Sequence, residues 1–301
     1  SSQAQSRVYV TDKGLIAELE HAGYPSEIIV NHEIDHGLFS ISSTSTVTGE
    51  AASSEFIKGL TLTTNSQLTG KTDLELTSQD TNFVNADLKA QGVEKLYLAA
   101  SKISATIHPE GEFSLQYSLP KTELRLENQS DMLIDNVSGK SEGKYLDDIF
   151  IGDANVAIDK MTINDIESNI HNVVNNVTYS SSNELAEVKD LPADNSLSST
   201  NILKLGEVTT DAGTLKNGVF NISFDDLNYD ALIKLVPLLQ DQELTPEKIQ
   251  QLMLSFDLLA AKGFSININE FSADVLGSKV ESKVLLNLPA GTARASQNAD
   301  Q

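Results

Sequence analysis

The sequence predicts a mainly β protein, a β-rich α+β fold in which an extended antiparallel sheet or meander carries a few covering helices. Apolar and polar residues alternate with a period of two from residue 28 to residue 126. Ser, Thr, Lys, Glu and Gln fill the polar positions, which is typical of a sheet with one buried and one wet face. Because no helical pattern separates these runs, we expect antiparallel pairing and not βαβ units.

The first predicted element is a helix that begins after Thr11 and ends at Gly23. Thr11 is a candidate N-cap, and Leu15, Ile16 and Leu19 share one helical face. The runs that follow are bounded by turn-like residues, and we expect each to form a strand. They cover residues 28–41, 56–62, 74–76, 96–107, 113–119, 124–126 and 154–163.

After residue 163 the strand-like alternation of apolar and polar residues gives way to other patterns. Apolar residues at helical spacing predict a second helix over residues 165–177. Residues 180–200 are polar and contain Pro192, so we expect a long loop or a linker there. Two further strands are predicted over residues 202–208 and 215–224.

Two helices are predicted in the last third of the chain, the first over residues 228–239. The second has Thr245 as its N-cap and Pro246 at its first position, and Gly263 ends it. Phe256 lies on the apolar face of this helix, so we expect its side chain to be buried. Two final strands are predicted over residues 264–271 and 275–288.

The domain organisation follows from these elements. We expect one β-rich domain over residues 8–290, with a candidate division into two sub-units near residues 180–200. Residues 291–301 are predicted to form a disordered tail.

Composition excludes several classes of protein. The chain of 301 residues has no Cys, so disulfides, thiolate zinc sites and cysteine nucleophiles are absent. It carries 21 Lys+Arg against 43 Asp+Glu, a net charge of −22, and we expect such a surface to repel nucleic acid. No apolar run approaches the length of about 20 residues that a membrane-spanning helix needs.

One motif resembles a catalytic metal site. His32, Glu33 and His36 match the HExxH pattern, in which two histidines on a helix bind zinc and the glutamate activates water. The flanking residues are strand-like, and residues four apart on a strand are separated by about 13 Å. We therefore interpret the motif as structural and predict no catalytic, cofactor-binding or metal-binding residue. A zinc-dependent hydrolase that uses His32 and His36 as ligands and Glu33 as base is the alternative.

Two other patterns have ordinary explanations. The residues from Gly139 to Gly143 match G-x-S-x-G, but no helix follows, so we predict a polar turn between strands. The acidic pairs Asp147-Asp148 and Asp225-Asp226 lack the spacing of a calcium loop, and solvated faces or helix caps explain them. A surface calcium site assembled by the fold is the open alternative, and no cofactor is predicted.

Three stretches of the chain have the pattern of a known family. In the segment VNHEIDHGLF, Ile34, His36 and Gly37 resemble a strand of the form "I-x-H-G-P-hydrophobic", although Leu38 stands where Pro is common. The residues from Phe224 to Leu232 are similar to a strand-to-helix passage, and those from Leu258 to Leu288 are similar to a helix end followed by final strands. In these features the chain resembles the YdgA-like family of bacterial cell-envelope proteins of unknown function.

The resemblance implies a periplasm-facing protein of a Gram-negative bacterium, tethered to the inner membrane by an N-terminal segment ahead of this sequence. It offers no catalytic residues to carry over. It also implies that His36 marks a conformational turn at a strand, where Gly37 lets the backbone bend. Members of the family are commonly longer, so the chain is expected to be a short version or a fragment.

The leading hypothesis is a non-enzymatic envelope protein, an antiparallel β-scaffold that binds an apolar ligand or a protein partner. A continuous apolar groove longer than about 15 Å would favour a lipid, and a polar surface with an unpaired edge strand would favour a protein. No nucleic-acid partner is expected, and contact with the membrane is expected only through the N-terminal anchor.

Overall fold

The fold is mainly antiparallel β, as predicted: strands make up 68% and helices 13% of the computed structural model. The described residues are 4–11, 14–21, 24–48, 59–83, 86–186, 195–289 and 291. The predicted tail over residues 291–301 lies outside them, apart from Gly291.

The chain forms two compact units and passes between them several times. The first unit consists of Ser1–Ser141, Val156–Asn176 and Val208–Ala212. The second unit consists of Glu142–Asn155, Val177–Glu207 and Gly213–Gln301.

The first unit begins with a strand meander. β1 (Ala4–Thr11) pairs with β2 (Gly14–His21), and β2 pairs with the first half of β3 (Tyr24–His36). The second half of β3 pairs with β4 (Ser40–Thr48). The helix predicted between Thr11 and Gly23 is therefore wrong. Two neighbouring strands satisfy the backbone donors and acceptors of β2, and this pairing overrides the local helical spacing.

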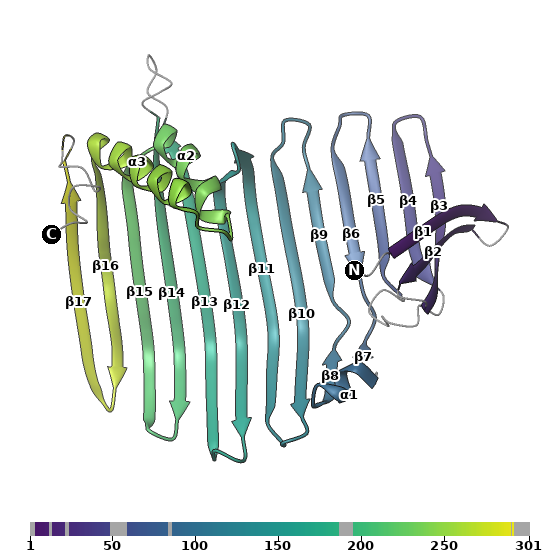
Figure 1. The fold of residues 1–301 in the computed structure, drawn as a ribbon, viewed down its shortest axis with the longest axis horizontal. Coiled ribbons are helices and arrows are strands. Elements are labelled where there is room, and N and C mark those ends of the chain that lie inside the picture. Colours follow the sequence, from purple (N-terminus) through teal and green to yellow (C-terminus); the bar gives the residue numbers. More distant parts are fainter. Residues whose placement is uncertain are drawn as a thin grey trace. The chain divides into compact units, whose positions relative to one another are not determined.

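The sheet of the first unit continues through the strands that follow (Figure 1). β4 pairs with β5 (Thr61–Gln67), β5 with β6 (Thr72–Thr77), β6 with β9 (Lys102–Ile107) and β9 with β10 (Phe113–Leu126). Between β6 and β9 the chain forms three further elements: β7 (Thr81–Phe83), the short helix α1 (Ala86–Ala90) and β8 (Val93–Leu98). β8 pairs with β7 and with the second half of β10. The pattern had not predicted α1.

Four long strands contribute residues to both units. They are β11 (Asp131–Leu146), β12 (Ile149–Asp165), β13 (Ile170–Ala186) and β14 (Ser196–Thr210). β13 occupies most of the predicted helix at 165–177, so that prediction is wrong. The loop predicted at 180–200 is wrong for residues 180–186 of β13 and 196–200 of β14, and its residues 187–194 lie outside the described part of the chain. Asn residues and the β-branched pair Val173-Val174 are poor helix formers, which explains why the strand prevails.

Two motifs of the middle region lie on these strands. The G-x-S-x-G sequence is inside β11, so the predicted turn is wrong. A side chain on Gly143 would collide with the backbone at Ile151 and Gly152, and glycine is needed for this close approach. Asp147 and Asp148 form the turn from β11 to β12 with φ values of 50° and 65°, as a type I′ hairpin turn requires.

The second unit contains the two long helices, both as predicted. β15 (Gly213–Asn228) leads into α2 (Tyr229–Gln240), and α3 (Pro246–Lys262) leads into β16 (Phe264–Val275) and β17 (Ser278–Leu288). Asn228 Oδ1 accepts a hydrogen bond from the Ala231 N–H at 3.0 Å. Thr245 Oγ1 accepts one from the Lys248 N–H at 3.3 Å, so the predicted N-cap is confirmed.

The helices lie across one face of the strands of the second unit (Figure 1). Among the described residues, most of the buried side chains belong to this unit. Ala231 and Leu235 of α2 and Leu259 and Ala260 of α3 are buried, as is Leu197 of β14. Phe256 is 43% exposed, so its predicted burial is wrong. α3 buries the face that contains Ser255 and Leu259, and Phe256 is about 100° further round the helix than Ser255.

Candidate functional site

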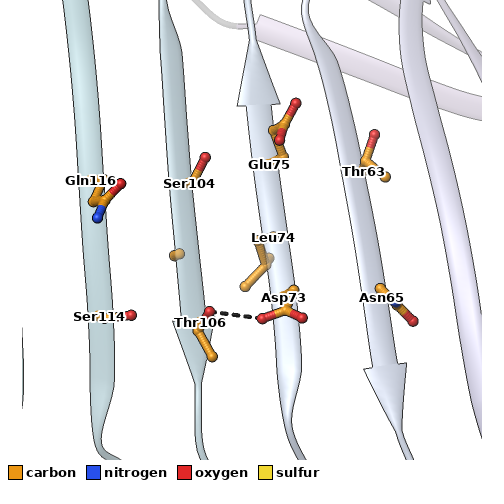
Figure 2. Close-up of a pocket in the computed structure, with 10 residues that line it drawn as sticks. Thr63, Asn65, Asp73, Leu74, Glu75, Ser104, Thr106, Ser114 and Gln116 are labelled. Atoms are coloured by element: carbon orange, nitrogen blue, oxygen red, sulfur yellow. Dashed lines mark hydrogen bonds between the residues drawn. The ribbon is translucent and has the colours of Figure 1, made fainter.

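The polar face of the sheet in the first unit holds a hollow made by four strands. Asn65 of β5, Asp73 of β6, Thr106 of β9 and Ser114 of β10 stand opposite one another in a row. The next row consists of Thr63, Glu75, Ser104 and Gln116. Together with the strand residues Leu74 and Ala105, these eight residues line a volume of about 410 Å³, which we call the polar hollow (Figure 2).

Hydrogen bonds and ion pairs hold both carboxylates of the polar hollow. Thr106 Oγ1 donates to Asp73 Oδ1 at 2.7 Å, and Figure 2 shows this bond across β9 and β6. Lys71 Nζ lies 3.8 Å from Asp73 Oδ2, and Lys102 Nζ lies 3.0 Å from Glu75 Oε2. The site therefore combines fixed hydrogen-bonding groups with little net charge.

The opposite face of the same sheet is apolar, because side chains alternate between faces along each strand. Its densest part, which we call the apolar face, consists of Leu62 of β5, Leu74 and Leu76 of β6, Ile103, Ala105 and Ile107 of β9, and Phe113, Leu115 and Tyr117 of β10. Ile103 is 40% exposed. Among the residues of this unit whose burial the structure describes, Thr81 is the one buried side chain. The apolar face is therefore only partly covered.

His32 and His36 lie on β3, so the strand predicted for them is confirmed. His32 stands opposite Ser45, whose hydroxyl is 2.6 Å from Nδ1, and His36 stands opposite Ile41. The strand separates the two histidines by about 13 Å. Glu33 points to the other face of the sheet, opposite Thr44. The three residues of the HExxH pattern are not brought together, and this geometry gives the zinc-hydrolase alternative no support.

Gly37 ends β3 as the resemblance implies: its N–H donates to the Ser40 carbonyl at 2.8 Å across the turn. Within the part of the chain that the structure describes, no group of three or more His, Cys, Asp or Glu side chains is placed to hold a metal ion.

Apolar side chains also cluster at the end of this sheet, on the turns after β3 and β5. The Leu68 N–H donates to the Phe39 carbonyl at 2.8 Å, which joins the two turns. A hollow of about 470 Å³ lies between them and is lined by Phe39, Ser40, Gln67, Leu68 and Thr69. Leu38, beside it, is 91% exposed.

The second unit offers a different surface at β17. This strand pairs with β16 along its whole length, and among the described strands of the unit it lies at the edge of the sheet (Figure 1). Val280, Val284 and Leu286 lie on one of its faces and Leu285 lies on the other, and all four are exposed. An exposed apolar edge strand can accept a further strand from a partner.

Glu123 and Tyr229 are two of the ionisable groups whose pKa values are shifted by structural partners. A hydrogen bond from Lys95 lowers the pKa of Glu123, and the charge of the same lysine adds to the effect. Burial, together with a hydrogen bond to Asp147, raises the pKa of Tyr229 to about 12. Both groups lie outside the polar hollow and the apolar face.

The comparison with known families gives one result. The whole chain, residues 1–301, matches the family described as "Bacterial protein of unknown function (DUF945)". The chain belongs to this family. A search of curated proteins and a search of solved structures each found no match. In the described part of this DUF945 protein, no helix is both long enough and apolar enough to cross a membrane.

The sequence analysis missed the polar hollow of this DUF945 protein. Asp73 and Thr106 are 33 positions apart, and only the pairing of β6 with β9 makes them neighbours. The alternation of polar and apolar residues identified the two faces, but the register that aligns the rows depends on the order of the strands.

Proposed function

We propose that this protein is a non-enzymatic scaffold of the bacterial cell envelope that binds an apolar ligand, namely an acyl chain, on the apolar face. The observation that carries the proposal is the exposure of this face. A sheet normally buries its apolar side against a second layer. Here Ile103 and Ile107 are exposed, and exposed apolar patches mark binding sites.

The apolar face measures about 14 Å in each direction, so an extended acyl chain fits along its diagonal of about 20 Å. From Ile103 to Ile107 along β9 the face extends about 14 Å, at 3.4 Å per residue. From Leu62 on β5 to Tyr117 on β10 it crosses three interstrand spacings, which is also about 14 Å. An acyl chain laid on this surface would remove both its own methylenes and the exposed isoleucines from water.

The location in the envelope rests on the resemblance to the YdgA-like family, with which membership in DUF945 is compatible. We propose that the protein faces the periplasm of a Gram-negative bacterium and is tethered to the inner membrane through an N-terminal segment. The net charge of −22 supports a role without nucleic acid.

A dansyl-labelled fatty acid tests the proposal, because its fluorescence rises when it enters an apolar site. The double variant Ile103→Thr, Ile107→Thr keeps β-branched side chains on β9 but places hydroxyls on the apolar face. We expect the Kd for the probe to rise about tenfold or more, which corresponds to about 1.4 kcal/mol.

Ser104→Ala, on the same strand but on the polar face, is the matched control and should bind the probe like the unaltered protein. Far-UV circular dichroism establishes that each variant is folded. Failure of the unaltered protein to bind the probe, or equal affinity in the double variant, would contradict the proposal.

A protein partner is the second candidate, and the exposed edge strand β17 favours it. A partner segment would add to β17 by main-chain hydrogen bonds and would cover Leu285, which is 71% exposed. A photo-crosslinking residue placed at position 285 tests this in cells of the source bacterium. We expect one specific crosslinked product from position 285 and none from position 254, where Leu254 of α3 is also an exposed apolar side chain.

A further inference from the structure

We propose that the polar hollow binds a neutral, polyhydroxylated ligand, and specifically a stretch of glycan chain. This inference concerns the face of the sheet opposite to the one that carries the proposed function, and it is independent of that function. It rests on the side chains that line the hollow, on their charge balance and on the regular grid that the strands impose (Figure 2).

The floor of the polar hollow consists of short side chains. Thr63, Asn65, Ser104, Thr106 and Ser114 occupy positions that long Lys or Glu side chains often fill on the wet face of a sheet. Short side chains leave open volume above the strands. They also lose little conformational entropy when they bind, because they have few rotatable bonds. The hollow is thus a surface of nearly fixed hydrogen-bonding groups.

The charge balance favours a neutral ligand. Lys71 and Lys102 stand beside Asp73 and Glu75, so the two carboxylates are matched by two ammonium groups. The rest of the lining is uncharged. A divalent cation would meet two lysines and only two carboxylates, whereas calcium takes six to eight oxygen ligands. In a protein with a net charge of −22, this locally balanced patch is suited to an uncharged ligand.

The chemistry of the lining matches that of sugar hydroxyls, which both donate and accept hydrogen bonds. The carboxylates of Asp73 and Glu75 are strong acceptors. The amides of Asn65 and Gln116, at opposite sides of the hollow, each provide donors and an acceptor. The hydroxyl groups of the lining do both. A ligand with many hydroxyls can therefore satisfy most of these groups at once.

The strands arrange these groups on a regular grid. Successive residues of one row are separated by one interstrand spacing of about 4.8 Å, and the two rows are about 7 Å apart. Four strands make the hollow about 14 Å wide, which is an elongated surface and not a closed cavity. The lining has no aromatic ring on which a sugar could stack, so we expect a Kd of about 1 mM.

Isothermal titration calorimetry with two soluble probes, chitohexaose and maltohexaose, tests the inference. We expect at least one probe to bind the unaltered protein. The double variant Asn65→Ala, Gln116→Ala should weaken binding at least tenfold, and Thr63→Ala should weaken it severalfold. Thr77→Ala lies on the same face of β6 but outside the hollow, and this matched control should bind normally.

Three results would overturn the inference: no binding of either probe at about 10 mM, equal binding by the double variant, or binding of Ca²⁺ in place of the saccharides. Circular dichroism and the urea midpoint show whether each variant is folded. Binding of the dansyl-labelled fatty acid should be the same in the unaltered protein and in the double variant. Failure of the glycan site is therefore distinguishable from failure of the proposed function.

Discussion

The phenolic hydroxyl of Tyr229, at the start of α2, donates a 2.9 Å hydrogen bond to the carboxylate of Asp147 in the turn between β11 and β12. The same hydroxyl lies 3.1 Å from the Leu146 carbonyl. The contact joins residues 82 positions apart and ties the first long helix to a hairpin turn of the second unit. Because Tyr229 must remain protonated to donate, the contact depends on pH.

Replacement of Tyr229 by Phe should lower the free energy of unfolding at pH 7 by about 1 kcal/mol, the usual value of one hydrogen bond. The pKa of Tyr229 is raised from 10.0 to about 12 in the folded protein. Its stabilising contribution is therefore complete below pH 10 and declines between pH 10 and pH 12. Urea titrations across this range measure the effect.

The unaltered protein should lose stability more steeply than Tyr229→Phe over this interval, by up to about 1.4 kcal/mol per pH unit. Tyr179→Phe, which removes the hydrogen bond from the Tyr179 hydroxyl to Asn201 Oδ1, serves as the control. Parallel curves for the unaltered protein and Tyr229→Phe would show that the contact with Asp147 does not form.

The ion pair of Lys95 and Glu123 should lose its stabilising effect at low pH, whereas the Tyr229 contact loses its effect at high pH. Lys95 Nζ lies 3.0 Å from Glu123 Oε2, and this hydrogen bond lowers the pKa of the carboxyl below its ordinary value of 4.5. The pair stabilises the fold above pH 4.5, and the contribution is lost as the pH falls through the lowered pKa. Because Lys95 is partly exposed, we expect a contribution of about 1 kcal/mol or less.

Lys95→Met should return the pKa of Glu123 toward its ordinary value, as measured by carboxyl carbon NMR. Lys102→Met, which removes the partner of Glu75, should leave the pKa of Glu123 unchanged. An unchanged pKa for Glu123 in Lys95→Met would contradict the role given to this hydrogen bond.

Helix α3 provides a test of which face is buried. Leu259 is 6% exposed and Phe256 is 43% exposed. Leu259→Ala should therefore lower the free energy of unfolding by about 2–5 kcal/mol, as is usual for buried leucine. Phe256→Ala should cost less than about 1 kcal/mol. The reverse order in urea titrations would mean that the helix is rotated about its axis.

Substitutions at Gly139 and Tyr117 should have non-additive effects on the free energy of unfolding. A methyl group on Gly139 would overlap the ring of Tyr117 on the neighbouring strand. Gly139→Ala should destabilise the protein by about 1–3 kcal/mol, because the ring must move. In the background of Tyr117→Ala the same change should be neutral or stabilising, since Ala is the better strand residue. A double-mutant cycle with a coupling energy below about 0.5 kcal/mol would contradict the contact.

Local signals in the sequence identify the elements whose ends are chemically marked. Asn228 and Thr245 both cap their helices, and Gly263 ends the second, so α2 and α3 were predicted at nearly their observed bounds. Such signals can also mislead: the segment with Leu15, Ile16 and Leu19 has helical spacing and is flanked by the candidate N-cap Thr11 and by Gly23. It becomes β2 because two strands pair with it, and no local window contains that information.

For the polar hollow, too, the sequence predicts the local arrangement but not the pairing of the strands. The alternation of residues along β9 predicts that Ser104 and Thr106 share a face. That these residues stand beside Asp73 and Glu75 depends on β9 pairing with β6 and not with β8, its neighbour in the chain. Burial of Phe256 was misjudged for a related reason, because the apolar side of α3 is wider than the part that the sheet covers.

The scarcity of buried side chains in the sheet from β3 to β10 has a consequence for the way it unfolds. Each of its strands gains stability mainly from the two strands beside it, as in a linear lattice of coupled repeats. Such a lattice opens from its ends inward at free energies below that of global unfolding. Amide protons of β5 and β6, in the interior, should therefore exchange more slowly than those of β1, and truncating terminal strands should shorten the lattice without collapsing the rest.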